Sequence, residues 1–231
     1  MPTLVCICAE PDTLFSYLEK YPNDGITFGN GTKLADGTVI NKPDSLDYVA
    51  LADADLGNDI DTRRSIAGQV HFFNGGPIYS SSKMINSKVD PNNTKLENRV
   101  NDPEGTCYIS TMGSELFAVS EASLKTQEFR ALINEMARPF KQTFLNTPTR
   151  VFTDNKSTQI TVVNEGHTKK SKHLSIRRAA VHEQVKLKNI VVQHVDGIYN
   201  IADIFTKALP KARFHEIRKL LVSTEISPIG A

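Results

Sequence analysis

The chain has 231 residues, 39% of them hydrophobic, and a formal net charge of +1 at pH 7, which is enough apolar material for one sizeable core. Its three cysteines, Cys6, Cys8 and Cys107, give neither a disulfide framework nor a four-ligand zinc set. The sequence has no apolar run of membrane-spanning length and its apolar start lacks a basic region, so we expect neither a membrane segment nor a signal peptide.

Strand-like patterns begin at Asp47, after residues 1–46, which contain many Pro, Gly and Asn residues. The run YVALADA (48–54) predicts a strand with Asp53 near its end, and SIAGQVHFF (65–73) and PIYSSSK (77–83) predict two more. The Asn74-Gly75-Gly76 sequence predicts a hairpin between the last two, so we expect three antiparallel strands. The polar stretch 85–107 predicts a loop insertion.

Helical spacing follows in SELFAVSEASLKTQEFRALINEMAR (114–138), with Ser114 as a candidate cap and Glu115 in the first turn. The predicted buried face of this helix consists of Leu116, Val119, Ser120, Phe129, Leu132, Ile133 and Met136. TRVFTD (149–154) predicts a short buried strand ending in Asp154.

The remaining elements alternate between helix and strand. We expect helices over 157–164 and 171–185, a fifth strand over 188–195, helices over 200–210 and 212–222, and a tail over 223–231. This order predicts an α/β fold with a five-stranded mixed sheet flanked by helices, as one domain over residues 47–222.

Four acidic residues stand at the ends of these elements: Asp53, Glu115, Asp154 and Asp203. A fold that brings them together needs divalent cations, because neighbouring carboxylates repel and raise one another's pKa values. Hard oxygen ligands favour Mg²⁺, with Mn²⁺ as a substitute. Two such ions about 3.5–4 Å apart are typical of enzymes that hydrolyse phosphodiesters.

Each acid has an alternative. Asp55 competes with Asp53, since residues two apart share a strand face, and Glu121 competes with Glu115 on the same helix. Asp154 could be a turn former and Asp203 a helix-dipole partner.

The stretch from 166 to 188 is strongly basic and predicts a phosphate-binding surface, unless it is simply a solvated helix face. The candidate nucleic-acid contacts are Asn155, Ser157, Lys169, Lys170, Lys172, His173, Arg177 and Arg178. His194 lies within a predicted strand, where a structural role is favoured.

Six segments resemble the ribonuclease H domain at the end of copia-type (Ty/copia) retrotransposon Pol polyproteins. They read LADADLGND, YSSSKM, GSELFAVSEAS, TDNKSTQ, KHLSIRRAAVHEQV and IADIFTKALP, and the last matches the family's LADIFTKPLP nearly letter for letter. In this resemblance the first catalytic Asp aligns with Asp53, and residues 1–46 are a remnant of the connection to the reverse transcriptase.

The resemblance implies a ribonuclease H-like fold and an Mg²⁺-dependent endonuclease that cuts the RNA strand of RNA–DNA hybrids during reverse transcription. Its partners would be the hybrid and the rest of the Pol polyprotein, in the cytoplasmic particle of the element with access to the nucleus. The alternative is a catalytically inactive or domesticated nucleic-acid-binding remnant. An integrase-like nuclease is disfavoured, because such enzymes have a D-D-E order and a zinc-binding segment.

Overall fold

The structure, a computed structural model, describes residues 16–17, 19–29, 32–33, 39–41, 46–57, 65–85, 111–141, 143–164 and 175–222. Its centre is a five-stranded sheet in the order β5-β4-β3-β6-β7. The strands are β3 (Tyr48–Asp55), β4 (Ile66–Phe73), β5 (Gly76–Met84), β6 (Thr149–Thr153) and β7 (Ile190–His194). The first three are antiparallel and β6 and β7 run parallel to β3, so the predicted mixed sheet is confirmed.

The hairpin between β4 and β5 forms where the sequence predicts it. Asn74 and Gly75 both have positive φ values, 49° and 82°, as a tight two-residue hairpin turn requires. Asn and Gly tolerate this region better than other residues, so the turn fixes the register of the two strands.

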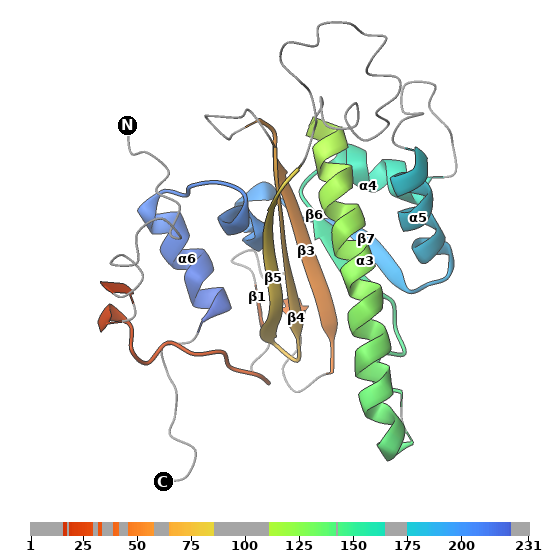
Figure 1. Ribbon diagram of the computed structural model, residues 1–231, viewed down its shortest axis with the longest axis horizontal. Coiled ribbons are helices and arrows are strands. Elements are labelled where there is room, and N and C mark those ends of the chain that lie inside the picture. Colours follow the sequence, from red (N-terminus) through yellow and green to blue (C-terminus); the bar gives the residue numbers. More distant parts are fainter. Residues whose placement is uncertain are drawn as a thin grey trace, which may run out of the picture.

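Helices cover both faces of the sheet (Figure 1). The helices α3 (Thr111–Ala137), α4 (Lys156–Val163) and α5 (Ser175–Lys186) lie on one side, where α3 packs on Ala50, Ala52 and Ala54 of β3. On the other side, Val49 and Leu51 pack against η5 (Ile201–Phe205) and α6 (Lys211–Leu221). The alternation along β3 therefore divides the core into two layers, since successive side chains point to opposite faces.

The long helix differs from the prediction in where it begins and in which side chains it buries near its C-terminal end. It begins by Thr111, so Ser114 is not its cap; Ser114 is buried and donates a hydrogen bond from Oγ to Ser65 Oγ at 3.3 Å. The predicted burial of Leu132 and Met136 is also wrong, because these side chains are 53% and 63% exposed. The C-terminal part of α3 extends past the strands (Figure 1), and Ile133 and Ala137 are buried there.

The segment after β7 is tighter than predicted. Instead of one helix over 200–210, the chain forms two short 3₁₀ turns, η4 (Gly197–Tyr199) and η5, before Pro210 leads into α6. Asn200 caps η5 by accepting a hydrogen bond from the Ala202 backbone N–H at 3.2 Å. These short turns place Asn200 and η5 against the end of β3, where Asn200 donates a hydrogen bond to the Ala52 carbonyl.

Residues before the sheet also contact it. Arg218 of α6 forms a buried ion pair with Asp24, and its guanidinium lies 3.8 Å from the centre of the Tyr21 ring. Gly29 donates a backbone hydrogen bond to the Asn74 carbonyl at 2.6 Å. A two-stranded sheet, β1 (Thr32–Lys33) with β2 (Val39–Asn41), follows.

The predicted domain boundary at 46/47 stays a prediction, although residues 16–17 and 19–29 include several that contact the body of the fold. The predicted insertion 85–107, apart from Ile85, and the predicted tail 223–231 lie outside the described residues. None of the helices in the described part of the chain has the length and apolar character that a bilayer span needs.

Candidate metal centre

Three of the four predicted acids meet at one end of the sheet. Asp53, Glu115 and Asp154 each place a carboxylate oxygen within 4.8 Å of the other two. Asp53 and Glu115 are 2% and 4% exposed, so most of this cluster is shielded from water. Such a group of oxygens matches the ligands that Mg²⁺ and Mn²⁺ prefer.

The strand pairing explains why these acids meet. Leu51 of β3 pairs with Phe152 of β6 in parallel register, and each strand places an Asp two residues later. The carboxyl ends of parallel neighbours lie at the same edge of a sheet, so Asp53 and Asp154 come together there. Glu115 reaches the same edge from the N-terminal part of α3, where it also accepts a hydrogen bond from the Ala54 backbone.

The pKa values of the three acids are all raised, which indicates that a bound cation would stabilise their charged forms. Burial, reinforced by Asp53 and Asp154, raises the pKa of Glu115 to about 9. Burial and Asp203 raise the pKa of Asp53 to about 7, although a hydrogen bond from Thr206 opposes the shift. Burial and Asp203 also raise the pKa of Asp154. Glu115 Oε2 is buried without a hydrogen-bond partner, so the residues fit a divalent ion.

The fourth acid, Asp203, lies beside the group of three. Its charge acts on both Asp53 and Asp154, yet its carboxylate is not among the three that meet within 4.8 Å. Asp203 Oδ1 lies instead 2.9 Å from the ammonium of Lys207, one helical turn further along the chain. The contact is an ion pair that is not aligned as a hydrogen bond.

Two residues that the sequence reasoning did not identify hold Asp53 in place. The Thr206 hydroxyl donates a hydrogen bond to Asp53 Oδ2, and Asn200 Nδ2 lies 3.5 Å from Asp53 Oδ1. Asn200 Nδ2 also donates to the Ala52 carbonyl at 3.1 Å. Both flank Asp203 in NIADIFT, so the polar residues around a predicted ligand were the available signal.

Close backbone approach is a second feature that the sequence did not reveal. A Cβ added at Gly197 would lie 3.1 Å from Asp154 Oδ2, and one added at Gly68 would lie 2.7 Å from Thr206 Cγ2. The two glycines therefore let η4 and η5 approach the acids closely.

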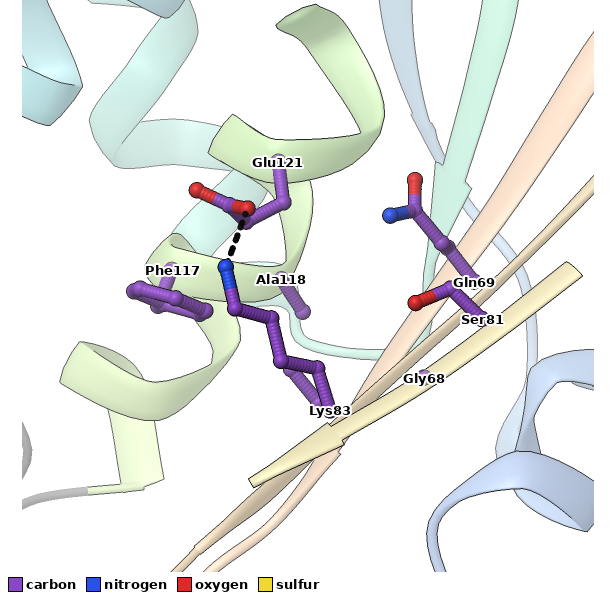
Figure 2. Close-up of a pocket in the computed structure, with 8 residues that line it drawn as sticks. Gly68, Gln69, Ser81, Lys83, Phe117, Ala118 and Glu121 are labelled. Atoms are coloured by element: carbon purple, nitrogen blue, oxygen red, sulfur yellow. Dashed lines mark hydrogen bonds and ion pairs between the residues drawn. The ribbon is translucent and has the colours of Figure 1, made fainter. Parts of the chain in front are cut away.

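The structure distinguishes between the alternative acids. Glu121, six residues beyond Glu115, lies in a small pocket between β5 and α3, where its carboxylate is 3.2 Å from Lys83 Nζ (Figure 2). Arg177 Nη1 lies 3.0 Å from the other Glu121 oxygen. Asp55 shares the strand face of Asp53 but is not among the three clustered acids. The geometry thus favours Asp53 and Glu115.

The candidate nucleic-acid contacts fall into three groups. Lys169, Lys170, Lys172 and His173 lie outside the described residues. Asn155 caps α4 by accepting a hydrogen bond from the Thr158 N–H at 2.9 Å, and Ser157 is exposed in the first turn. As nucleic-acid contacts, all of these stay predictions.

The two arginines are already engaged within the fold. Arg177 pairs with Glu121 and stacks over Phe117, 4.2 Å from the ring centre. Arg178 is 7% exposed and donates hydrogen bonds to the carbonyls of Thr161 and Asn164, which disfavours a contact with nucleic acid. His194 Nε2 donates to the Asp154 carbonyl at 3.1 Å, a structural arrangement.

Comparison with known proteins supports the resemblance. The chain is 22% identical over 208 residues to the retrovirus-related Pol polyprotein from transposon TNT 1-94 of Nicotiana tabacum. That alignment covers 90% of this chain and 13% of the relative, so the chain spans a small part of the relative's length. No family model matches the chain.

Three solved structures show a similar arrangement. RNase H1 from Halobacterium salinarum NRC-1 has a TM-score of 0.43 at 14% identity, with 69% of this chain and 93% of that chain covered. LC11-RNase H1 in complex with RNA/DNA hybrid has 0.44 at 12%, with 69% and 93% covered. The protease–reverse transcriptase of prototype foamy virus has 0.42 at 15%, with 78% and 23% covered.

All three TM-scores are below 0.5, so the identification of the fold rests on the strand order and directions described above. The order β5-β4-β3-β6-β7, with three antiparallel strands followed by two parallel ones, is that of the ribonuclease H-like fold. The predicted resemblance is therefore confirmed: the chain has a ribonuclease H-like fold and is similar in sequence to part of a retrotransposon Pol polyprotein.

Proposed function

We propose that this protein is a metal-dependent ribonuclease H that cleaves the RNA strand of RNA–DNA hybrids, as part of a copia-type Pol polyprotein. The observation that carries the proposal is the convergence of Asp53, Glu115 and Asp154 within 4.8 Å, at the edge where β3 and β6 end. The sequence relative supports the retrotransposon origin.

The acids would act as metal ligands. Asp53, Glu115 and Asp154 would hold two Mg²⁺ ions, or Mn²⁺ in their place, together with Asp203, which pairs with Lys207 in this structure. When bound, the ions would lower the pKa of the attacking water and neutralise the charge that develops on the leaving oxygen.

The neighbouring residues would position those ligands. Thr206 and Asn200 orient the Asp53 carboxylate through hydrogen bonds, and the His194–Asp154 hydrogen bond fixes the backbone that carries Asp154. The rigid elements behind each acid, β3, β6 and α3, keep the oxygens at fixed separations. Such preorganisation is what phosphoryl-transfer sites require of the protein.

The hybrid is the proposed substrate because the chain has a ribonuclease H-like fold and resembles part of a retrotransposon Pol polyprotein. In that family the domain acts on RNA–DNA hybrids during reverse transcription. Recognition of the RNA strand requires contacts to 2′-hydroxyl groups, for which Asn155 and Ser157 remain the candidates. We propose the cytoplasmic particle of the element as the place of action.

Cleavage assays test the proposal. The protein is incubated with labelled RNA–DNA hybrid, double-stranded RNA or double-stranded DNA, in Mg²⁺ or in chelator. We expect cleavage of the RNA strand of the hybrid in Mg²⁺ alone, with the DNA duplex intact, and loss of cleavage in the Asp154→Asn variant. Equal cleavage of a DNA duplex, or unchanged cleavage by Asp154→Asn, would contradict the proposal.

A further inference from the structure

Lys207 brings a positive charge into the acidic end of the sheet. Its ammonium lies 2.9 Å from Asp203 Oδ1, and the two residues are spaced four apart on the same turn. The Asp203 side chain is 10% exposed, whereas the Lys207 side chain is 37% exposed. The carboxylate is therefore fixed within the fold, while the ammonium is held at its solvent side.

The ammonium also acts on the acids around Asp203. Asp53 and Asp55 both attract it, in addition to Asp203 itself. The residue before it, Thr206, donates a hydrogen bond to Asp53, so the backbone on one side of Lys207 is anchored to the cluster. This anchoring limits how far Lys207 can move away with its backbone, and leaves its flexible side chain as the part that can move.

The position of Asp203 gives the second observation. Three acids meet within 4.8 Å, and the acid left out of that group is the one paired with a lysine. An ammonium 2.9 Å from Asp203 Oδ1 would lie close to a divalent ion bound to the same carboxylate, and the two cations would repel, so Lys207 weakens Asp203 as a metal ligand.

We propose that Lys207 is a built-in counter-ion of the metal centre, which pairs with Asp203 while no divalent ion is bound and competes with such an ion for that carboxylate. The inference rests on the proposed function, since it concerns the same centre. It makes Lys207 a positioning residue that sets how much divalent ion the protein needs.

Two opposite effects follow from this competition. Without divalent ions, loss of the ammonium leaves Asp203 buried among other acids without its partner, so the fold becomes less stable. With divalent ions, the same loss removes a competitor, so less Mg²⁺ is needed to occupy the centre. A lysine that merely stabilised the fold would produce the first effect without the second.

Thermal unfolding across an Mg²⁺ series measures both effects, because an ion that binds the native state alone raises the melting temperature by mass action. The variants are Lys207→Met, which keeps the apolar stem, and Lys211→Met as a control, an exposed lysine with the same change in net charge. The dissociation constant of Mg²⁺ is taken from the concentration dependence, so a change in the metal-free melting temperature does not confound it.

We expect Lys207→Met to melt lower than wild type in chelator and to bind Mg²⁺ at least threefold more tightly, while Lys211→Met matches wild type. Lys207→Arg provides a second variant if Lys207→Met does not fold. It keeps the charge and can grip Asp203 with two parallel hydrogen bonds, so it should bind Mg²⁺ more weakly than wild type.

Unchanged or weaker Mg²⁺ binding by Lys207→Met overturns the inference, as does unchanged or tighter binding by Lys207→Arg. If wild type still cleaves the hybrid in that case, the proposed function stands and the counter-ion role alone fails. If no protein in the series responds to Mg²⁺ and wild type cleaves nothing, both fail together.

Discussion

The Glu115→Gln substitution tests the strongly raised pKa of the Glu115 carboxyl in the metal-free fold. Glu115 has a raised pKa of about 9 in the folded protein, against an ordinary value of 4.5. Between these two values the native state binds more protons than the unfolded state, so the free energy of unfolding falls as the pH rises. Each pH unit above 4.5 costs about 1.36 kcal/mol, so at pH 7 the cost is on the order of 3 kcal/mol.

Glutamine keeps the shape of the side chain and does not titrate. In chelator, Glu115→Gln should therefore match wild type near pH 4.5 and be more stable by about 3 kcal/mol at pH 7. Urea denaturation followed by far-ultraviolet circular dichroism at several pH values measures the difference. In Mg²⁺ the gain should shrink, because bound ions stabilise wild type more than the variant.

Glu135→Gln is the matched control, since Glu135 lies on the same helix with its side chain 61% exposed. Its stability relative to wild type should change little with pH. The reasoning would be refuted by a Glu115→Gln variant that is less stable than wild type at pH 7, or by a difference that does not grow with pH. Either result would mean that Glu115 is ionised at no cost in the metal-free protein.

Two further substitutions test the contacts that support the centre. Gly68→Ala would place a Cβ 2.7 Å from Thr206 Cγ2. The free energy of unfolding in urea denaturation should therefore fall by about 1–3 kcal/mol, and the hybrid should be cleaved more slowly. Wild-type values for both would contradict the close approach of η5 to β4. Arg218→Met should lower the free energy of unfolding by about 3 kcal/mol, because it removes the ion-pair partner of the buried Asp24. Lys219→Met, at an exposed neighbour, should cost little. Equal losses in the two variants would mean that the segment around Asp24 does not depend on α6.

The sheet could be predicted because its signals are local. Apolar runs mark β3 and β6, and Asn74-Gly75 marks the hairpin, so these elements form where the sequence places them. The positions of Asp53 and Asp154 followed directly, since each ends such a run. Parallel pairing of β3 with β6 then brings the two acids to one edge.

The errors arose where burial depends on distant parts of the chain. Leu132 and Met136 follow the helical spacing of a buried face, yet that end of α3 extends past the sheet and leaves them exposed. Ser114 has the chemistry of a cap, but the helix begins before it, so it lies buried within the helix. Spacing along one element cannot reveal where its neighbours end.

The sequence led us to expect the convergence of acids, of which three meet, but it did not reveal the contacts that support them. Asp203 was predicted to be a fourth ligand, but its pairing with Lys207 depends on the turn at the end of η5, where the Lys207 N–H donates a hydrogen bond to the Asp203 carbonyl. The hydrogen bonds from Thr206 and Asn200 to Asp53 join residues about 150 positions apart, so their place beside Asp203 marks them as polar neighbours of a predicted ligand but does not indicate their partner.

The central claim is that the carboxylates of Asp53, Glu115 and Asp154 bind catalytic divalent ions, and counting bound Mn²⁺ tests it most directly. Electron paramagnetic resonance of the protein with a non-cleavable hybrid gives the number of ions held at saturation. We predict two Mn²⁺ ions per chain for wild type and fewer for Asp154→Asn, with hybrid binding retained. Equal numbers of bound ions in the two proteins, or none in wild type, would contradict the account.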